Sequence, residues 1–344
     1  MALKLVGPDF FDLSALLSEE EIAIQNMTND WVKNRFYPLI SKHYREGTFP
    51  FELQKEMGGM GFFGSTLPEK YDTAGINSVA YGLMMQELER GDSGLRSFAS
   101  VQGSLVMWPI WKYGSEVQKQ KWLPLLASGE KIGCFGLTEP DYGSNPGGMI
   151  TRVKHEGDNF ILNGTKMWIT NSPVADVALI WAKDEGGEVR GFLVERGTPG
   201  FETPEIKGKL SLRASVTGEI VLSNCEIPLE NQLPEADGLK APLSCLTQAR
   251  YGINWGGMGS AIACYEEAVD YAKTRIQFDK PIAAFQLTQQ KLAEMLNEIT
   301  KAQFLTLQLG RLKDRATLNH KQVSLAKMNN VRMAIEIARS ARSI

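Results

Sequence analysis

The sequence predicts an α+β protein made of a helical segment, a central antiparallel β segment and a second helical segment. Two observations predict this order. Before residue 130 and after residue 239, apolar residues recur every three or four positions, the spacing of one helix face. Between these segments lie short alternating runs of β-branched and aromatic residues, separated by Gly, Asn and Pro, as is typical of strands. The predicted domains are 1–130, 131–238 and 239–344.

Composition excludes several classes of protein. The chain has 344 residues, of which 43% are hydrophobic and 22% are charged, and its formal net charge is -3. This is the profile of a globular protein with no basic excess, so we expect no nucleic-acid partner. Apolar runs are too short for a membrane span, and the N-terminus lacks a secretory apolar core. We expect a cytoplasmic bacterial protein, or a mitochondrial-matrix protein if the chain is processed.

The cysteines and histidines are too scattered to predict a metal site. No two cysteines form a C-x-x-C pair, and the three histidines are far apart in the sequence. We therefore expect reduced, mostly buried thiols, no metal, and chemistry that depends on a bound cofactor. These residues are Cys134, Cys225, Cys245, Cys264, His43, His155 and His320.

The first domain is predicted to be a helical bundle. Its segment 78–90 carries apolar residues at spacings of three and four, which indicates an amphipathic helix. Proline disfavours a continued helix, both at its own position and at the residue before it. We therefore expect helix breaks at Phe49-Pro50, Leu67-Pro68 and Trp108-Pro109.

Two segments of the central domain suit a flat cofactor. A strand expected over 132–138 is followed by a Gly, Pro, Ser and Asn loop that exposes backbone N–H groups and hydroxyls, although a plain surface turn has the same composition. Asn163-Gly164 predicts a β-hairpin, because this pair readily takes the positive φ angles of a primed turn. On the return strand, alternation puts Trp168 and Thr170 on one face, where they suit a planar ring; a Trp packed in the sheet core is the alternative.

The third domain is predicted to contain three long helices, over 243–275, 285–314 and 321–344. The last helix keeps an apolar side as far as Ile344 and shows no Gly or Pro stop signal. We therefore expect the C-terminal helical domain to be incomplete in this chain.

A charged turn in the first domain is a candidate binding site. Residues 91–97 read GDSGLRS, and Ser93 is the expected helix cap. Arg96 would lie in the first helical turn, where a cation opposes the helix dipole and where an incoming carboxylate is attracted. Glu89 lies across the turn and would orient the guanidinium. A solvated arginine is the alternative interpretation.

A second charged segment joins two helices of the third domain. Arg275 and Phe278 precede a turn at Lys280-Pro281, and Gln286 follows it. An amide-rich helix junction of this kind suits a phosphate or a nucleotide, although such residues are usually only solvated.

Four motifs occur in a fixed order: FGLTEPDYGSN, KMWITN, SLRAS, and RIQF with a following Gln. In this combination the chain resembles the acyl-CoA dehydrogenase family, most closely its glutaryl-CoA dehydrogenases, over residues 18–344. The resemblance implies an N-terminal helical domain, a central β domain and a C-terminal helical bundle. It also implies a homotetramer, arranged as a dimer of dimers, with FAD at the subunit contacts.

The resemblance implies a set of FAD-binding residues. The loop of the first motif would line the flavin and its pyrophosphate, and the second motif would cover the flavin ring. The implied residues are Phe135, Leu137, Thr138, Gly143, Ser144, Trp168, Ile169 and Thr170, with Arg275, Phe278 and Gln286 reaching the FAD of a neighbouring subunit.

The resemblance also implies the substrate contacts. Ser144 and Arg250 would contact the CoA thioester portion, and Arg96 with Ser97 would bind the far carboxylate of a glutaryl chain. An apolar acyl tail would leave the Arg96 cation unpaired, which is costly. Glu89 completes the pattern of members that also decarboxylate their product to crotonyl-CoA. The implied role is in lysine and tryptophan degradation, with electrons passing to an electron-transfer flavoprotein.

The expected catalytic base is not found in the chain. By resemblance it is a Glu expected beyond Ile344, and the other location used in the family, just before Arg250, holds Ala249. Asp279 also departs from the family pattern, which has glycine there. Two alternatives stay open: a different short, branched or cyclic acyl-CoA as substrate, with Arg96 serving structure, or a non-catalytic homologue that binds acyl-CoA.

Overall fold

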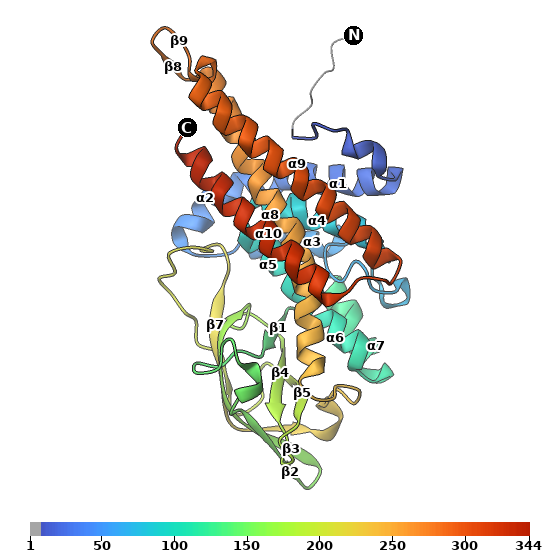
Figure 1. Cartoon of the computed structure of the whole chain (residues 1–344). Helices are drawn as coiled ribbons and strands as arrows, with labels where there is room; N and C mark the ends of the chain where they lie inside the picture. Colours follow the sequence, from blue (N-terminus) through green and yellow to red (C-terminus); the bar gives the residue numbers. More distant parts are fainter. Residues whose placement is uncertain (1–7) are drawn as a thin grey trace. The chain divides into compact units, whose positions relative to one another are not determined.

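The computed structural model describes residues 8–344, which divide into two compact units (Figure 1). Unit 1 contains residues 8–38, Asn77–Arg96 and Arg250–Ile344, and unit 2 contains Leu39–Ile76 and Ser97–Ala249. Along the chain the elements follow the order helical, β, helical, so the predicted fold class is confirmed. No helix within residues 8–344 is both long and apolar enough to cross a membrane.

Unit 1 is helical, and the three long C-terminal helices are present as predicted. α1 packs on α4, α4 packs on α9, and α9 packs on α10. The first helix begins at a capping box in which Ser18 and Glu21 each bond the other's backbone N–H. The helices of unit 1 are α1 Glu19–Trp31, α4 Ser78–Gly91, α9 Gln286–Asp314 and α10 His320–Arg342, together with most of α8 Lys240–Thr274.

A buried layer of polar side chains fixes the register of the long helices. The Asn330 amide on α10 donates to the Asn254 side chain on α8 at 2.9 Å and to the Thr306 hydroxyl on α9 at 2.7 Å. All three residues are fully buried. Because a buried amide without a partner is costly, sliding one helix along another breaks these bonds.

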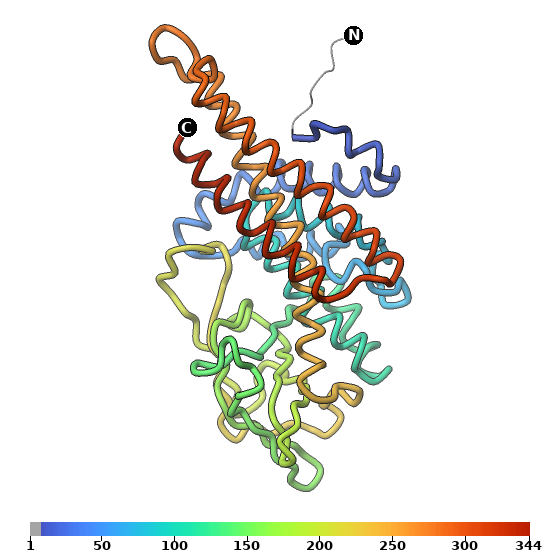
Figure 2. Tube along the Cα trace, viewed as in Figure 1, coloured from blue at the N-terminus to red at the C-terminus, as the bar shows by residue number. Residues whose placement is uncertain are grey.

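A short hairpin joins α8 to α9 in unit 1 (Figure 2). Its strands are β8 Ile276–Gln277 and β9 Lys280–Pro281, and its two-residue turn is Phe278-Asp279. Both turn residues have positive φ, 51° and 59°, which is the conformation of a type I′ turn. The turn leaves Phe278 85% exposed at the tip.

The helices of unit 2 correct one predicted break. Trp108-Pro109 does not end a helix, because the π-helical segment Val101–Met107 runs directly into α6, where Pro109 is the second residue. The wider π-helical turn makes room for the proline ring and needs no N–H from it. The helices are α2 Tyr37–Glu46, which begins in unit 1, α3 Gln54–Gly59, α6 Trp108–Tyr113 and α7 Glu116–Ala127; α5 Ser93–Ser100 begins in unit 1 and ends in unit 2.

The sheet of unit 2 has seven strands in the order β1-β4-β2-β3-β7-β6, with β5 also paired to β4. Most pairs are antiparallel, as expected, but β1 and β2 are each parallel to β4. β4 is buried along nearly its whole length, in keeping with its apolar sequence. The strands are β1 Gly133–Gly136, β2 Arg152–Glu156, β3 Asn159–Thr170, β4 Val177–Lys183, β5 Val189–Glu195, β6 Phe201–Glu202 and β7 Thr217–Pro228.

The predicted hairpin at Asn163-Gly164 is wrong. These residues lie inside the long strand β3, where a register shift against β7 falls between Leu162 and Gly164. Gly164 is needed there because a Cβ atom would come within 2.5 Å of the Thr151 hydroxyl, and its φ is +148°. The hairpin turn lies earlier, at residues 157–158 between β2 and β3.

Candidate active site

The first and second motifs meet in unit 2. Strand β1 carries Phe135, which is buried, and the chain continues through the buried Leu137 to the half-buried Thr138. The Met167 N–H donates to the Thr138 carbonyl at 2.8 Å, which joins the two motifs directly. Farther along the loop, Gly143 and Ser144 are exposed.

A buried ion pair, which sequence reasoning missed, ties the loop of the first motif to β3. The Lys166 ammonium donates to the Glu139 carboxylate at 2.8 Å and to the Leu137 carbonyl at 3.2 Å. Glu139 also accepts the Ile150 N–H at 2.7 Å, and both the N–H and the hydroxyl of Thr151. One carboxylate therefore holds both ends of the loop 139–151.

The electrostatics of this pair follow from its burial. Both side chains are inaccessible, at 0% and 1% exposure. Burial lowers the pKa of Lys166 to about 8, even though Glu139 beside it raises that pKa. Burial raises the pKa of Glu139, but its bonds with Ile150, Lys166 and Thr151 outweigh burial and leave that pKa below its ordinary value. A lysine within an apolar strand was the sequence signal for this pair.

Trp168 lies at a break in the strand pattern. The register of β3 against β7 shifts between Lys166 and Ile169, and Trp168 has a positive φ of 61°. Exposure still alternates across this shift, because Trp168 is exposed, Ile169 is buried and Thr170 is half-buried, which is the pattern expected if Trp168 and Thr170 share one face. The indole is not in the sheet core, because Trp168 is 59% exposed.

The residues of these two motifs fit a flavin. Thr138 and Thr170 are half-buried, and within residues 8–344 neither hydroxyl has a hydrogen-bond partner, so both are available to a ring heteroatom. The exposed Trp168 offers an apolar face to a planar ring. The exposed backbone at Gly143 leaves open space where a Cβ atom would lie.

The charged turn of unit 1 forms a compact cluster, but its helix cap differs from the prediction. Asp92 caps α5, because its carboxylate accepts the Gly94 N–H at 2.6 Å. Ser93 is the first helical residue, and its hydroxyl donates to Glu89 at 2.5 Å instead of capping the helix. Burial, followed by the neighbouring charge of Glu89, raises the pKa of Asp92 despite opposing contributions from Gly94 and Arg96.

Glu89 orients Arg96, as expected. One carboxylate oxygen of Glu89 accepts the hydroxyls of Ser93 and Ser260, the latter at 3.2 Å, and the other accepts Arg96 Nε. The Arg96 and Glu89 side chains are only 13% and 7% exposed. Among the residues that the structure describes, none bonds Nη1 or Nη2 of Arg96. The guanidinium therefore keeps its outer donors for a ligand.

The remaining predicted residues are distributed over both units. Ser97 is half-buried in unit 2, and Arg250 is exposed on α8 in unit 1. Arg275 and Gln286 are exposed on either side of the β8–β9 hairpin that carries Phe278. The buried Ile169 faces away from solvent next to Trp168.

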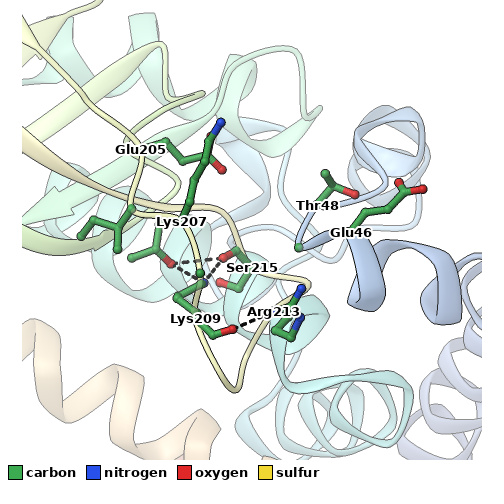
Figure 3. Close-up of a pocket in the computed structure, with 11 residues that line it drawn as sticks. Glu46, Thr48, Glu205, Lys207, Lys209, Arg213 and Ser215 are labelled. Carbon is green, nitrogen blue, oxygen red and sulfur yellow. Dashed lines mark hydrogen bonds and ion pairs between the residues drawn. The ribbon is translucent and has the colours of Figure 1, made fainter.

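A cavity of about 210 Å³ in unit 2 lies beside the SLRAS motif (Figure 3). Two cationic side chains that line it, Lys209 and Arg213, already form hydrogen bonds within the protein. The Lys209 ammonium donates to the Leu212 and Ser215 carbonyls and to the Thr217 hydroxyl. Arg213 donates to backbone carbonyls, including those of Tyr44 and Arg45 near the end of α2. These two cations therefore hold the loop in place through its backbone carbonyls.

No group of three or more His, Cys, Asp and Glu side chains within residues 8–344 is placed to hold a metal ion. The four cysteines are free thiols, three of them buried and Cys264 half-buried, in agreement with the sequence.

Family models match most of the chain. The acyl-CoA dehydrogenase N-terminal domain matches residues 18–130, the middle domain matches 134–225 and the C-terminal domain matches 236–344. A solved glutaryl-CoA dehydrogenase from Mycobacterium smegmatis, in complex with FADH2, is 52% identical with a TM-score of 0.96, and the match covers 98% of this chain and 87% of that chain.

Two curated relatives support the same family assignment. The human mitochondrial short-chain specific acyl-CoA dehydrogenase is 34% identical over 336 residues, covering 96% of this chain and 82% of the relative. A glutaryl-CoA dehydrogenase from Desulfococcus multivorans is 36% identical over 321 residues, covering 90% and 82%. This chain belongs to the acyl-CoA dehydrogenase family, a family of FAD-dependent oxidoreductases.

Proposed function

We propose that the protein oxidises glutaryl-CoA at its α and β carbons and releases crotonyl-CoA after decarboxylation. The observation that carries this proposal is the Arg96 guanidinium, held through Nε by Glu89 with both Nη groups left without a partner among the described residues. A planar fork of this kind matches a carboxylate bidentately.

The nature of the acyl chain follows from the cost of burying a cation. Arg96 is 13% exposed, so an apolar acyl tail placed against it would leave N–H donors desolvated and unpaired. A glutaryl chain ends in a carboxylate that pairs with these donors. The similarity to two glutaryl-CoA dehydrogenases supports the same substrate.

The chain's own residues would hold FAD and CoA. Thr138 and Thr170 would donate to the flavin ring and Trp168 would cover it, because these hydroxyls are unpaired in the described structure and the indole is exposed. When bound, FAD supplies a hydride acceptor for the β carbon. Ser144 and Arg250 would contact the CoA thioester portion. The α proton would pass to a carboxylate base, which position 249 does not supply because Ala249 has no acid–base group.

The assembly and the electron acceptor are part of the proposal. Arg275 and Gln286 flank one exposed hairpin that carries Phe278 at its tip, and this arrangement suits contact with a neighbouring subunit's FAD in a homotetramer. We propose an electron-transfer flavoprotein as the acceptor, on the family resemblance.

The direct test follows the flavin absorbance of the purified FAD-loaded protein after addition of glutaryl-CoA. We expect the flavin to bleach and carbon dioxide to be released in step with turnover in the presence of an electron acceptor. A yellow protein whose flavin stays oxidised with glutaryl-CoA contradicts the proposal.

A second candidate substrate is a short-chain acyl-CoA, favoured by the 34% identity to the human short-chain specific enzyme. Butyryl-CoA in the same assay separates the two. A higher kcat/KM for butyryl-CoA than for glutaryl-CoA would favour the second candidate.

A further inference from the structure

We propose that two residues of α8, Gly256 and Ser260, set the orientation of Arg96 and thereby the preference of the site for an acyl chain that ends in a carboxylate. This inference rests on the proposed function, because it assigns the specificity of that same site. Both are positioning residues that act through Glu89. Neither belongs to a motif that the sequence analysis singled out.

Gly256 allows the Glu89–Arg96 pair to pack against bare helix backbone. A Cβ atom at position 256 would lie 2.8 Å from Glu89 Oε2 and 3.2 Å from Arg96 Nε. Real side-chain carbons do not approach other atoms at the first of these distances, so one partner of the pair would have to move. Any side chain at 256 therefore displaces the contact that aims the guanidinium.

Ser260 limits how Glu89 can respond to such a displacement. It lies four residues after Gly256, on the same face of α8, and its hydroxyl donates to Glu89 Oε1 at 3.2 Å. Ser93 on α5 donates to the same oxygen at 2.5 Å. With Oε1 held by two hydroxyls, Oε2 accepts from Arg96 Nε, and this arrangement keeps Glu89 away from the Nη groups.

The net charge of this cluster does not by itself select a dicarboxylic acyl chain. The direction of the Arg96 N–H donors makes the selection. Glu89 and Asp92 both lie beside the Arg96 guanidinium, and Glu89 is ion-paired with it. An acyl carboxylate therefore enters a cluster in which the cation is already balanced. It gains mainly from two well-aimed N–H donors, and those donors are lost if Glu89 rotates onto them.

The experiment compares substitutions on α8 in the FAD-loaded full-length protein. The variants are Gly256→Ala and Ser260→Ala. Their matched controls on the same helix are Gly257→Ala, where the nearest atoms to a new Cβ belong to Asn330 at 3.3 Å, and Ser244→Ala, whose hydroxyl contacts Tyr113. Each variant is assayed for kcat and KM with glutaryl-CoA and with butyryl-CoA.

We expect Gly256→Ala to raise KM for glutaryl-CoA by about tenfold or more, as for a lost charge-assisted hydrogen bond, with little change for butyryl-CoA. Ser260→Ala should raise KM for glutaryl-CoA relative to KM for butyryl-CoA by about threefold, because a neutral donor at 3.2 Å makes a weaker bond. The control variants should leave the ratio of the two KM values unchanged. A purely structural role would lower activity with both substrates equally.

Arg96→Gln separates failure of this inference from failure of the proposed function. The test quantity is kcat/KM for glutaryl-CoA divided by kcat/KM for butyryl-CoA. If Arg96→Gln leaves this ratio unchanged, the proposed function is wrong and this inference fails with it. If Arg96→Gln lowers the ratio but Gly256→Ala and Ser260→Ala behave like their controls, the substrate stands and the role of α8 is overturned.

Discussion

The two units each contain a glutamate paired with a basic side chain, and the two pairs are built differently. In unit 2, Glu139 and Lys166 are 1% and 0% exposed, and the pair also bonds Leu137, Ile150 and Thr151. In unit 1, Glu89 is likewise fully bonded, but Arg96 uses only Nε. A saturated pair holds backbone in place, whereas a half-used pair leaves donors for a ligand.

The choice of cation suits each task. A lysine ammonium is a compact charge with three donors, which a buried loop and one carboxylate can satisfy. An arginine guanidinium is planar and wide, so one edge binds Glu89 while the other edge remains for an incoming carboxylate. The comparison predicts that damage to the first pair affects folding and that damage to the second affects substrate choice.

The largest expected effect is that of Lys166→Met. Removing the cation leaves the Glu139 charge buried without its partner, which costs about 3–5 kcal/mol of unfolding free energy. Denaturant unfolding measures this loss, and FAD retention should fall with it. Lys154→Met is the control, because its pair with Glu156 is more than half exposed and screened by solvent, so its loss should change the unfolding free energy little. Equal stability of the two variants would remove the distinction between the pairs.

A smaller effect is expected for Arg96→Lys, which keeps the charge and loses the fork. We expect kcat/KM for glutaryl-CoA to fall about 30-fold, about 2 kcal/mol, with unfolding free energy nearly unchanged. Steady-state kinetics and denaturant unfolding of the same preparation check both parts. A lysine that supports full activity would show that a point charge suffices.

The unfolding free energy should depend on pH through the saturated pair, Glu139 and Lys166. The pKa of Glu139 is lowered in the folded protein, so its contribution is present above the ordinary value of 4.5 and is lost as the pH falls through the folded pKa. Lys166 has a folded pKa of about 8 against 10.5, so its contribution to stability rises between those values. In Glu139→Gln, the unfolding free energy should change less steeply with pH below 4.5 than in the natural protein. An unchanged slope would contradict this assignment.

The smallest expected effect is a difference in reactivity among the cysteine thiols of the two units. Burial raises the pKa of Cys134, on β1, to about 12, that of Cys225 to about 11 and that of Cys245 to about 12. In native protein at pH 8 with a colorimetric thiol reagent, we expect the half-buried Cys264 of α8 to react first. Fast labelling of Cys134 would show that the region around β1 opens more readily than its burial implies.

The order of the elements could be predicted because helices and strands differ in hydrophobic period over long windows. The local errors arose where one residue pair was given more weight than its surroundings. Asn163-Gly164 suits a turn, but the strand around it continues because both sides pair with β7. Trp108-Pro109 suits a break, but the preceding π-helical segment accommodates the proline.

Part of the candidate site could also be predicted, namely the parts that lie close together in sequence. Glu89 and Arg96 are seven residues apart, so one turn brings them together. Ser260 and Gly256 reach the same cluster only through the packing of α8, and no local pattern reveals that. The pairing of Glu139 with Lys166 likewise depends on the meeting of a loop with a distant strand.

The placement of Asn163-Gly164 inside β3 affects how the protein ages chemically. In a flexible chain the glycine nitrogen of such a dipeptide attacks the asparagine side chain and expels ammonia. Here the Asn163 amide is bonded to Asn224 on both its nitrogen and its oxygen, and Gly164 is paired opposite Leu222. The extended strand keeps the attacking nitrogen away from the amide carbon. Deamidation at Asn163 should therefore record the time that a sample has spent unfolded.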